Sequence, residues 1–399
     1  MKRKLLYLIS VLFMLMMSAG CKEKDMGTPA ASTVAAFSYI INNQGYAPCE
    51  VVFTNLSLNA TGYSWDFGNG QTSTEKNPTT SYATPGLYNV KLTCTPLNAV
   101  YYNQAVKIMV VNVKDLNAGL TQVLYYTSRG TVGNGHMVIL NDSTPHPLDF
   151  VEADLARPYG IAVDTANRKV YITDYSNKAI YRYERDGTLP RKILDAGVAG
   201  QELVGDPEAI FVLGNKIYWG RTGGIYKANL DGSNPEVHID FGTGPPEYPI
   251  DMQYDPATNK IYFVNDKTDY SGGFWSVNFD GTGMTKIIPD VDGTAIEMDF
   301  RNGKAYLVLY GSAGTVAPEN GVFMCNIDGT SLTKIGDFGA KATWGITLDE
   351  KRNKLIWGYK ISNSLPDGKI IRANLDGSSP EDWITGVSPH AMSVVWIKL

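Results

Sequence analysis

The chain has 399 residues and a formal net charge of −5, and charged residues make up 19% of it. It carries no basic stripe, so nucleic acid is excluded as an expected partner. After the first 21 residues, no segment is long and apolar enough to cross a membrane. Charged residues are sparse, Gly and Tyr are plentiful (40 and 24), and no helical period is sustained, so we expect an all-β secreted protein.

The N-terminal segment is predicted to be a targeting signal outside the fold. A basic stretch, Lys2 to Lys4, precedes an apolar stretch, Leu5 to Met17, that is too short to span a bilayer. The segment ends in Ser-Ala-Gly-Cys at residues 18–21. This ending resembles a bacterial lipobox, which implies a signal peptide over residues 1–20 and a lipid on Cys21. The alternative is ordinary secretion with cleavage near Ala19.

Residues 21–32 are predicted to be a linker. Its charged start, Lys22 to Asp25, is similar to the export signals of surface lipoproteins in the Bacteroidetes. Together with the lipobox, this similarity implies an outer-membrane protein that is lipid-anchored and exposed at the cell surface. Whether the protein faces outward or into the periplasm does not follow from these residues.

Residues 33–115 are predicted to form short strands separated by turns. The segment Tyr63–Gly70 (YSWDFGNG), followed by Pro85–Val90 (PGLYNV), resembles PKD (polycystic-kidney-disease) domains. Asn69 stands where the family signature has a second acidic residue. The resemblance implies an immunoglobulin-like β-sandwich that holds the following domain away from the membrane. We interpret Asp66 and Asn69 as turn residues and assign no ligand to them.

Two cysteines fall in this domain. Alternation places Cys49 on one strand face with Val51, and Cys94 on another with Leu92. If both are core faces, the cysteines project into one interior near its end. Export favours oxidation, and a Cys49–Cys94 disulfide would stabilise the domain by ~4 kcal/mol in the chain-entropy model. The alternative is a pair of reduced, buried thiols.

From about residue 157 a pattern recurs every 42 to 49 residues: an apolar strand, a turn ending in Lys, an aromatic strand, a loop, a third strand, then Asp-Gly. The segment 123–150 supplies only the second to fourth strands of a unit, and Ser388–Leu399 supplies only the first. Pairing these ends gives a sixth unit and leaves no open sheet edge. Residues 120–399 are therefore predicted to form a six-bladed β-propeller, closed by pairing of its N- and C-terminal strands. The complete copies begin at Arg157, Asp206, Tyr248, Gly293 and Ala342.

The repeats are similar to the YWTD repeats of low-density-lipoprotein-receptor propellers. The similarity spans residues 120–399, but only Tyr171–Asp174 keeps the Tyr-x-Thr-Asp sequence. It implies a role in protein binding or structure. Related six-bladed rings include NHL-type binding modules and lactonase-like enzymes.

One face of the predicted ring varies from blade to blade. Turns between first and second strands are short and alike, whereas the second-to-third loops run from a minimal one at 221–224 to long ones at 265–273, 309–321 and 359–368. These loops share a rim with the starts of the innermost strands, so binding is expected on this loop-rich face. The residues expected there are Arg157, Tyr159, Glu208, Tyr248, Asp251, Glu297, Trp344 and His390 from the innermost strands, with Arg129, Tyr175, Arg221, Tyr270 and Tyr310 from the loops.

Aromatic side chains beside carboxylates and arginines suit a sugar or a peptide. We therefore expect a non-enzymatic binding module for an extracellular glycan or protein ligand, with no cofactor and no catalytic residue. The aromatic residues could instead pack between blades. The other candidate function is a metal-dependent hydrolase, lactonase or lyase. Its divalent cation would lie in the channel, held by Glu208, Asp251, Glu297 and His390.

Overall fold

The computed structural model describes residues 31–399 apart from several short gaps. The expected signal peptide, the lipid on Cys21, most of the linker and Tyr270 lie outside the described residues. In the described part, regular structure is all β except for two 3-10 turns, and no helix could cross a membrane. The chain divides into two compact units, one ending at Ala118 and the other beginning at Gly119. The gaps are 101, 116, 130–132, 141–144, 146, 243–245, 266–271, 311–319, 342, 363–364 and 399.

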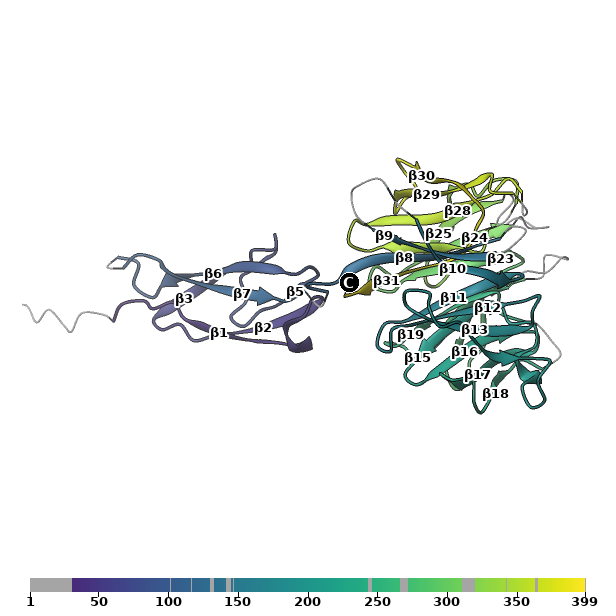
Figure 1. Ribbon diagram of the computed structural model, residues 1–399. Coiled ribbons are helices and arrows are strands. Elements are labelled where there is room, and N and C mark those ends of the chain that lie inside the picture. The colour runs from purple at the N-terminus through teal and green to yellow at the C-terminus, as the bar shows by residue number, and fades with distance from the viewer. Residues whose placement is uncertain are drawn as a thin grey trace, which may run out of the picture. The chain divides into compact units, whose positions relative to one another are not determined.

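The first unit is a sandwich of two antiparallel sheets (Figure 1). Side chains from both sheets form one core around Trp65, which is fully buried. Its indole lies edge-on to Phe37, with the ring centroids 5.0 Å apart, and Phe53 packs 5.4 Å away. One sheet has the order β1 (Phe37–Ile41), β2 (Cys49–Asn55), β5 (Thr79–Tyr82), and the other β4 (Thr72–Ser73), β3 (Ala60–Asp66), β6 (Gly86–Pro96), β7 (Ala105–Val113).

The polar residues after β3 hold a turn, as the sequence predicted. Asp66 Oδ1 accepts the backbone N–H of Gly68 at 3.0 Å. Asn69 Oδ1 accepts the backbone N–H of Gln71 at 3.0 Å, and Asn69 Nδ2 donates to the carbonyl of Ser81 at 3.0 Å. Gly68 has φ +74°, and a Cβ there would lie 3.0 Å from a backbone oxygen. These side chains are therefore used by the turn itself.

The expected disulfide is absent. Cys49 and Cys94 are both buried, as predicted, but both are free. Cys49 is the first residue of the seven-residue strand β2. The thiol of Cys94 lies 3.2 Å from Ser57 Oγ, just beyond the other end of that strand. A strand of this length spans ~20 Å, whereas a disulfide needs Cα atoms within ~7 Å, so the two cysteines lie at opposite ends of the core.

Because no disulfide links these cysteines, a reducing agent is expected to leave the stability of the sandwich unchanged. Thermal unfolding of residues 31–118, measured with and without dithiothreitol, should give the same midpoint. A midpoint that falls by several degrees on reduction would contradict the structure. Titration of two free thiols in the denatured domain provides the matching chemical readout.

The second unit has a β-propeller fold. Its described residues form six four-stranded sheets. Five of the sheets correspond to the five sequence repeats, each with its strands in chain order. They are β11 (Pro158–Asp164), β12 (Lys169–Asp174), β13 (Ala179–Glu184), β14 (Arg191–Asp195); β15 (Ile210–Leu213), β16 (Lys216–Arg221), β17 (Gly224–Asn229), β18 (Glu236–Asp240); β19 (Asp251–Asp255), β20 (Lys260–Asn265), β21 (Gly273–Asn278), β22 (Thr285–Pro289); β23 (Asp292–Asp299), β24 (Lys304–Tyr310), β25 (Gly321–Asn326), β26 (Thr333–Gly336); and β27 (Ile346–Asp349), β28 (Lys354–Tyr359), β29 (Gly368–Asn374), β30 (Glu381–Val387).

The sixth sheet combines both ends of the unit. It contains β8 (Thr121–Ser128), β9 (Gly133–Ile139) and β10 (Leu148–Leu155), with β31 (Pro389–Ile397) added beside β8. The predicted pairing is present, with Val394 opposite Leu124. Figure 1 shows β31 alongside β8, where yellow and blue strands meet. Strand β31 also contacts β27 on one side and β11 on the other.

Hydroxyl groups link neighbouring sheets at the starts of the innermost strands. Thr173 Oγ1 accepts the backbone N–H of Gly160 at 2.7 Å and donates to the carbonyl of Glu208, in the next sheet, at 2.6 Å. Thr294 Oγ1 likewise donates to the carbonyl of Thr343 at 2.8 Å. The threonine of the Tyr-x-Thr-Asp sequence therefore joins two sheets.

Candidate ligand-binding site on the loop-rich face

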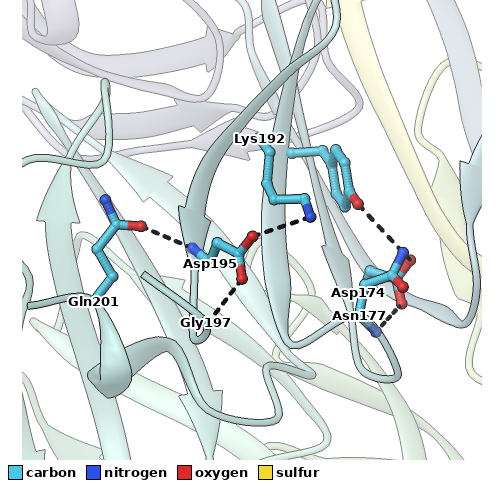
Figure 2. A network of polar contacts seen from close by, with 7 residues as sticks. Asp174, Asn177, Lys192, Asp195, Gly197 and Gln201 are labelled. Atoms are coloured by element: carbon cyan, nitrogen blue, oxygen red, sulfur yellow. Dashed lines mark hydrogen bonds and ion pairs between the residues drawn. The ribbon is translucent and has the colours of Figure 1, made fainter. Parts of the chain in front are cut away.

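Asp174, the last residue of the Tyr-x-Thr-Asp sequence, fixes the backbone that leads into β11. Its carboxylate accepts the backbone N–H groups of Ala156 at 2.6 Å and Arg157 at 3.0 Å. It also accepts the backbone N–H of Asn177 at 3.0 Å and its side-chain amide at 2.9 Å (Figure 2). Asp174 is fully buried. Its bonds to Ala156 and Arg157 position Arg157, and its bonds to Asn177 fix the loop after β12.

A second carboxylate in Figure 2 anchors the segment between β14 and β15. Asp195 pairs with Lys192 at 3.1 Å, and its Oδ1 accepts the backbone N–H of Gly197 at 2.9 Å. The Asp195 backbone N–H donates to Gln201 Oε1 at 2.9 Å. The bond from Gly197, followed by the Lys192 ammonium, holds the pKa of the Asp195 carboxyl below its usual range. Unlike Asp174, this carboxylate is partly exposed.

Removing the Asp174 carboxylate is expected to lower the stability of the protein more than removing the Asp195 carboxylate. Asp174→Ala leaves buried donors unpaired and should lower the free energy of unfolding by about 2–4 kcal/mol. Asp195→Ala, whose donors can reach water, should lower it by about 1 kcal/mol or less. Urea unfolding of the two variants tests this difference. Equal losses would show that Asp174 does not carry the buried network described here.

Four basic side chains meet at the starts of the innermost strands, and we refer to them as the cationic cluster. Arg129 follows β8, Arg157 precedes β11, Lys360 follows β28, and His390 lies in β31. Lys360 and His390 are both fully buried. The first, fifth and sixth sheets therefore contribute to one site, which lies beside the variable second-to-third loops.

Aromatic rings hold the cationic cluster in place. The rings of Trp344 and His390 are parallel, with centroids 4.4 Å apart. Tyr159 lies edge-on to both, at 5.5 Å and 4.9 Å. Lys360 Nζ lies 4.6 Å from the Trp344 centroid. The Arg157 guanidinium lies 4.9 Å from the Tyr159 centroid and donates to its hydroxyl. Tyr159 and Trp344 are thus packed within the protein, which agrees with the alternative in which these aromatic residues serve packing.

What the site offers a ligand is a set of unused hydrogen-bonding atoms. Lys360 Nζ is buried without a hydrogen-bond partner, and the same holds for Trp344 Nε1 and Arg157 Nε. Thr343 directly precedes Trp344, and Ser388 lies two residues before His390. The hydroxyl oxygens of both, Thr343 Oγ1 and Ser388 Oγ, are also buried and unpaired. Buried polar groups in proteins nearly always have partners, so the concentration of unpaired ones makes this place the candidate binding site.

The charges in the cluster repel one another. Burial, and then Arg129 and Arg157, lower the pKa of Lys360 to about 7. Burial and the same three cations hold the pKa of His390 well below its usual value, so this imidazole is neutral. Burial and Arg157 lower the pKa of Arg129. Within the described residues, no carboxylate forms an ion pair with Arg129, Arg157 or Lys360.

Two of the predicted rim residues lie inside the channel instead. A cavity of about 320 Å³ is lined by the innermost strands of all six sheets, and Asp251 and Glu297 face it. Asp251 Oδ2 accepts the backbone N–H of Ile296 at 2.9 Å. Glu297 Oε2 accepts Gln253 Nε2 at 2.8 Å, and Gln253 Oε1 accepts the backbone N–H of Met298 at 3.0 Å. These bonds tie β19 to β23.

The channel carboxyls favour their protonated forms. Burial raises the pKa of Asp251 to about 7. Burial, and to a smaller extent the like charge of Asp251, raises the pKa of Glu297 to about 8. Each side chain keeps some accessible surface because it faces the cavity, yet protein surrounds it. No cation pairs with either acid in the described part of the chain.

The four residues considered as metal ligands do not converge. Among the described residues, no three His, Cys, Asp or Glu side chains are placed to hold one ion. His390 belongs to the cationic cluster, where Lys360 and the two arginines oppose a cation, whereas Asp251 and Glu297 face the channel. The alternative that placed all four around one cation is therefore not supported by the described residues, because strand position alone does not tell which end of the channel a side chain faces.

The other predicted residues have separate surroundings. Arg221 donates to backbone carbonyls of Thr222 at 3.1 Å and Leu203 at 3.2 Å, and stacks on Tyr226. Glu208 is buried, and its backbone accepts from Thr173. Tyr248 is half-buried.

Lys360 was missed by the sequence analysis. It is the residue directly after the second strand of its repeat, the same place that Arg129 occupies in the sixth sheet. Aligning that single position across the repeats would have shown two basic residues, one at each end of the run of complete copies. Arg129 and Lys360 belong to neighbouring sheets, and the contacts of β31 bring those sheets together.

Comparison with known proteins adds a family for the first unit. Residues 28–110 match the family model of the PKD domain. The N-terminal unit contains a PKD domain. A stretch of 37 residues, 9% of this chain, is 62% identical to the pre-pro-metalloprotease PrtV of Vibrio cholerae, of which the match spans only 4%. The PKD domain accounts for about the first quarter of the chain and leaves the propeller to be compared by structure.

Two solved structures share the propeller fold. One, from a nidogen/laminin complex, covers 68% of this chain and 98% of its own, with 19% identity and a TM-score of 0.54. The other, TolB from Acinetobacter baumannii, covers 79% of this chain and 80% of its own, with 12% identity and a TM-score of 0.51. At these identities the likeness shows the fold and nothing about the ligand.

The raised pKa of Glu297 predicts a pH-dependent stability. The folded state binds this proton more tightly than the unfolded chain, so its contribution is complete below about pH 4.5 and is lost as the pH rises to about 8. Glu297→Gln should therefore raise the free energy of unfolding above that of the wild type at pH 9. The gain at pH 9 should exceed the gain at pH 5 by about 1–3 kcal/mol.

Thermal unfolding between pH 5 and pH 9 measures this effect. The matched control is Glu236→Gln, on β18, whose carboxylate is more than half exposed beside Lys227. The control should keep the wild-type pH profile. If Glu297→Gln also keeps it, the channel carboxyl is not held in its protonated form.

Proposed function

We propose that this chain is a lipid-anchored outer-membrane protein, exposed at the cell surface, whose six-bladed, closed propeller binds an extracellular ligand without chemically changing it. The ligand binds at the cationic cluster on the loop-rich face. The lipobox-like sequence ending in Cys21 supports the anchor, and the PKD domain serves as the spacer between anchor and propeller. The pairing of β31 with β8 supports closure.

One observation carries the binding role. The Lys360 ammonium is fully buried without a hydrogen-bond partner, beside two arginines that no described carboxylate neutralises. Such an arrangement is costly in the free protein, because buried charges normally have partners. It becomes favourable when a ligand supplies the missing acceptors. The aromatic rings that fix Lys360 and Arg157 keep the donors in place before the ligand arrives, which lowers the entropy cost of binding.

A metal-dependent hydrolase, lactonase or lyase is the second candidate. It is favoured by the channel cavity with its two carboxyls, Asp251 and Glu297. Their hydrogen bonds already tie β19 to β23, which accounts for them without a metal. A divalent cation that stabilises the protein reversibly on chelation, with the effect lost in Asp251→Ala, would support this candidate instead.

Glycan-array binding tests the binding role. The whole mature chain should retain at least one glycan from an array of neutral and acidic glycans, and Arg157→Ala should weaken this retention at least tenfold. Lys334→Ala is the matched control, because Lys334 lies on the outer strand β26 and pairs with Asp337 at 3.1 Å. Retention that survives Arg157→Ala would place binding elsewhere, and an array without any bound glycan would contradict the glycan-binding role.

A further inference from the structure

We propose that the ligand of the cationic cluster is an acidic saccharide whose carboxylate or sulfate group binds between Lys360, Arg129 and Arg157. This inference rests on the proposed function and adds the charge and class of the ligand.

Charge comes first. Lys360 is 0% exposed and Arg129 and Arg157 are close enough to disfavour its protonation. An ammonium in such surroundings needs an anion, and the described part of the protein supplies none. A ligand oxyanion would accept from Lys360 Nζ and from the guanidinium groups, which match the planar geometry of a carboxylate or sulfate. The chain as a whole carries −5, so anions are attracted to this cluster rather than to the surface in general.

Access favours a narrow ligand group. The backbone of Lys360 is held on both sides, since its N–H donates to the carbonyl of Phe338 at 2.8 Å and its carbonyl accepts from Lys341 at 3.3 Å. Gly339 packs against the same carbonyl so closely that a Cβ would lie 2.1 Å from it. These contacts fix the backbone of Lys360, and its Nζ is buried. A ligand therefore has to project its oxyanion inward to reach the ammonium, as an acidic group on a single sugar ring can.

The neutral groups favour a saccharide over an acidic peptide. Thr343 Oγ1 and Ser388 Oγ are buried at 0% and 4% exposure without partners, and Trp344 Nε1 is an unused donor. Hydroxyls both donate and accept, so they complement the hydroxyls of a sugar. An acidic peptide would satisfy the cations but would leave these groups to its backbone alone.

The same geometry makes binding depend on pH through Lys360. Burial and the neighbouring cations keep the pKa of His390 well below its usual value, so His390 stays neutral in this range, whereas Lys360, with a pKa of about 7, changes charge between pH 6 and pH 8.5. An acidic ligand binds the protonated form, so its affinity should fall as the pH rises through 7. A neutral saccharide should show no such change.

Calorimetric titration of the whole mature chain tests the proposal. The probes are uronate oligosaccharides of two to four units, their sulfated and neutral counterparts, and a tetraglutamate peptide, each at pH 6 and pH 8.5. At least one acidic saccharide should bind ten or more times tighter than its neutral counterpart, and tighter at pH 6 than at pH 8.5. The uronate and sulfated arms identify which oxyanion is used.

Two variants make the result specific. Lys360→Met should weaken acidic-saccharide binding at least tenfold and abolish the pH dependence, while raising the thermal midpoint because a buried charge is removed. Arg129→Gln should weaken binding without lowering the midpoint, because it removes a repelling charge, so a folding defect in one variant does not leave the test open. Lys334→Met should change neither affinity nor midpoint.

The outcomes separate the two proposals. A neutral saccharide that binds as tightly as its acidic counterpart, and is lost in Arg157→Ala, would overturn this inference and leave the proposed function standing. Tighter binding of tetraglutamate than of any saccharide would also overturn it, in favour of an acidic protein. No binding by any probe would overturn it together with glycan recognition.

Discussion

The propeller depends on one long-range pairing, the addition of β31 to β8. These strands are separated by about 270 residues, yet Val394 and Leu124 are direct partners. Without β31, the edge of β8 would expose a row of backbone donors and acceptors, and the sixth sheet would have no innermost strand. The pairing therefore completes both the hydrogen bonding of the last sheet and the lining of the channel.

The cationic cluster is a consequence of this pairing. Strand β31 contacts β27 on one side and β11 on the other. It thereby brings His390 against Trp344, from the fifth repeat, and against Tyr159, from the first. The site thus combines the two ends of the propeller, which are far apart in sequence, and it depends on the junction that β31 forms.

Buried charges are divided between two places in the propeller, and they are treated differently. The channel carboxyls share hydrogen bonds with backbone groups and Gln253 and tie two sheets together. The cations of the cluster are fixed by aromatic rings, but they lack acceptors in the described part of the chain. Protonation neutralises a buried carboxyl, whereas an arginine stays charged, so the channel acids need no further partner while the cations of the cluster would gain from an anion. This difference is the physical basis of the proposed binding site.

The sequence by itself determined the all-β class, the sandwich and the repeat with its complementary ends. The all-β class and the repeat follow from local alternation, turn residues and the period of the repeats, which need no knowledge of distant contacts. The sandwich was implied by the resemblance of residues 63–90 to PKD domains. The sequence also predicted eight innermost-strand residues on one rim, of which the structure brings Arg157, Tyr159, Trp344 and His390 together. Tertiary structure decided what local pattern cannot express. It put Cys49 and Cys94 at opposite ends of one core, turned Asp251 and Glu297 into the channel, and brought Lys360 to the arginines. The direction in which a side chain points, its burial and its contacts depend on how the strands pack across the whole unit. Residues that occupy equivalent positions in the repeat therefore lie in different surroundings.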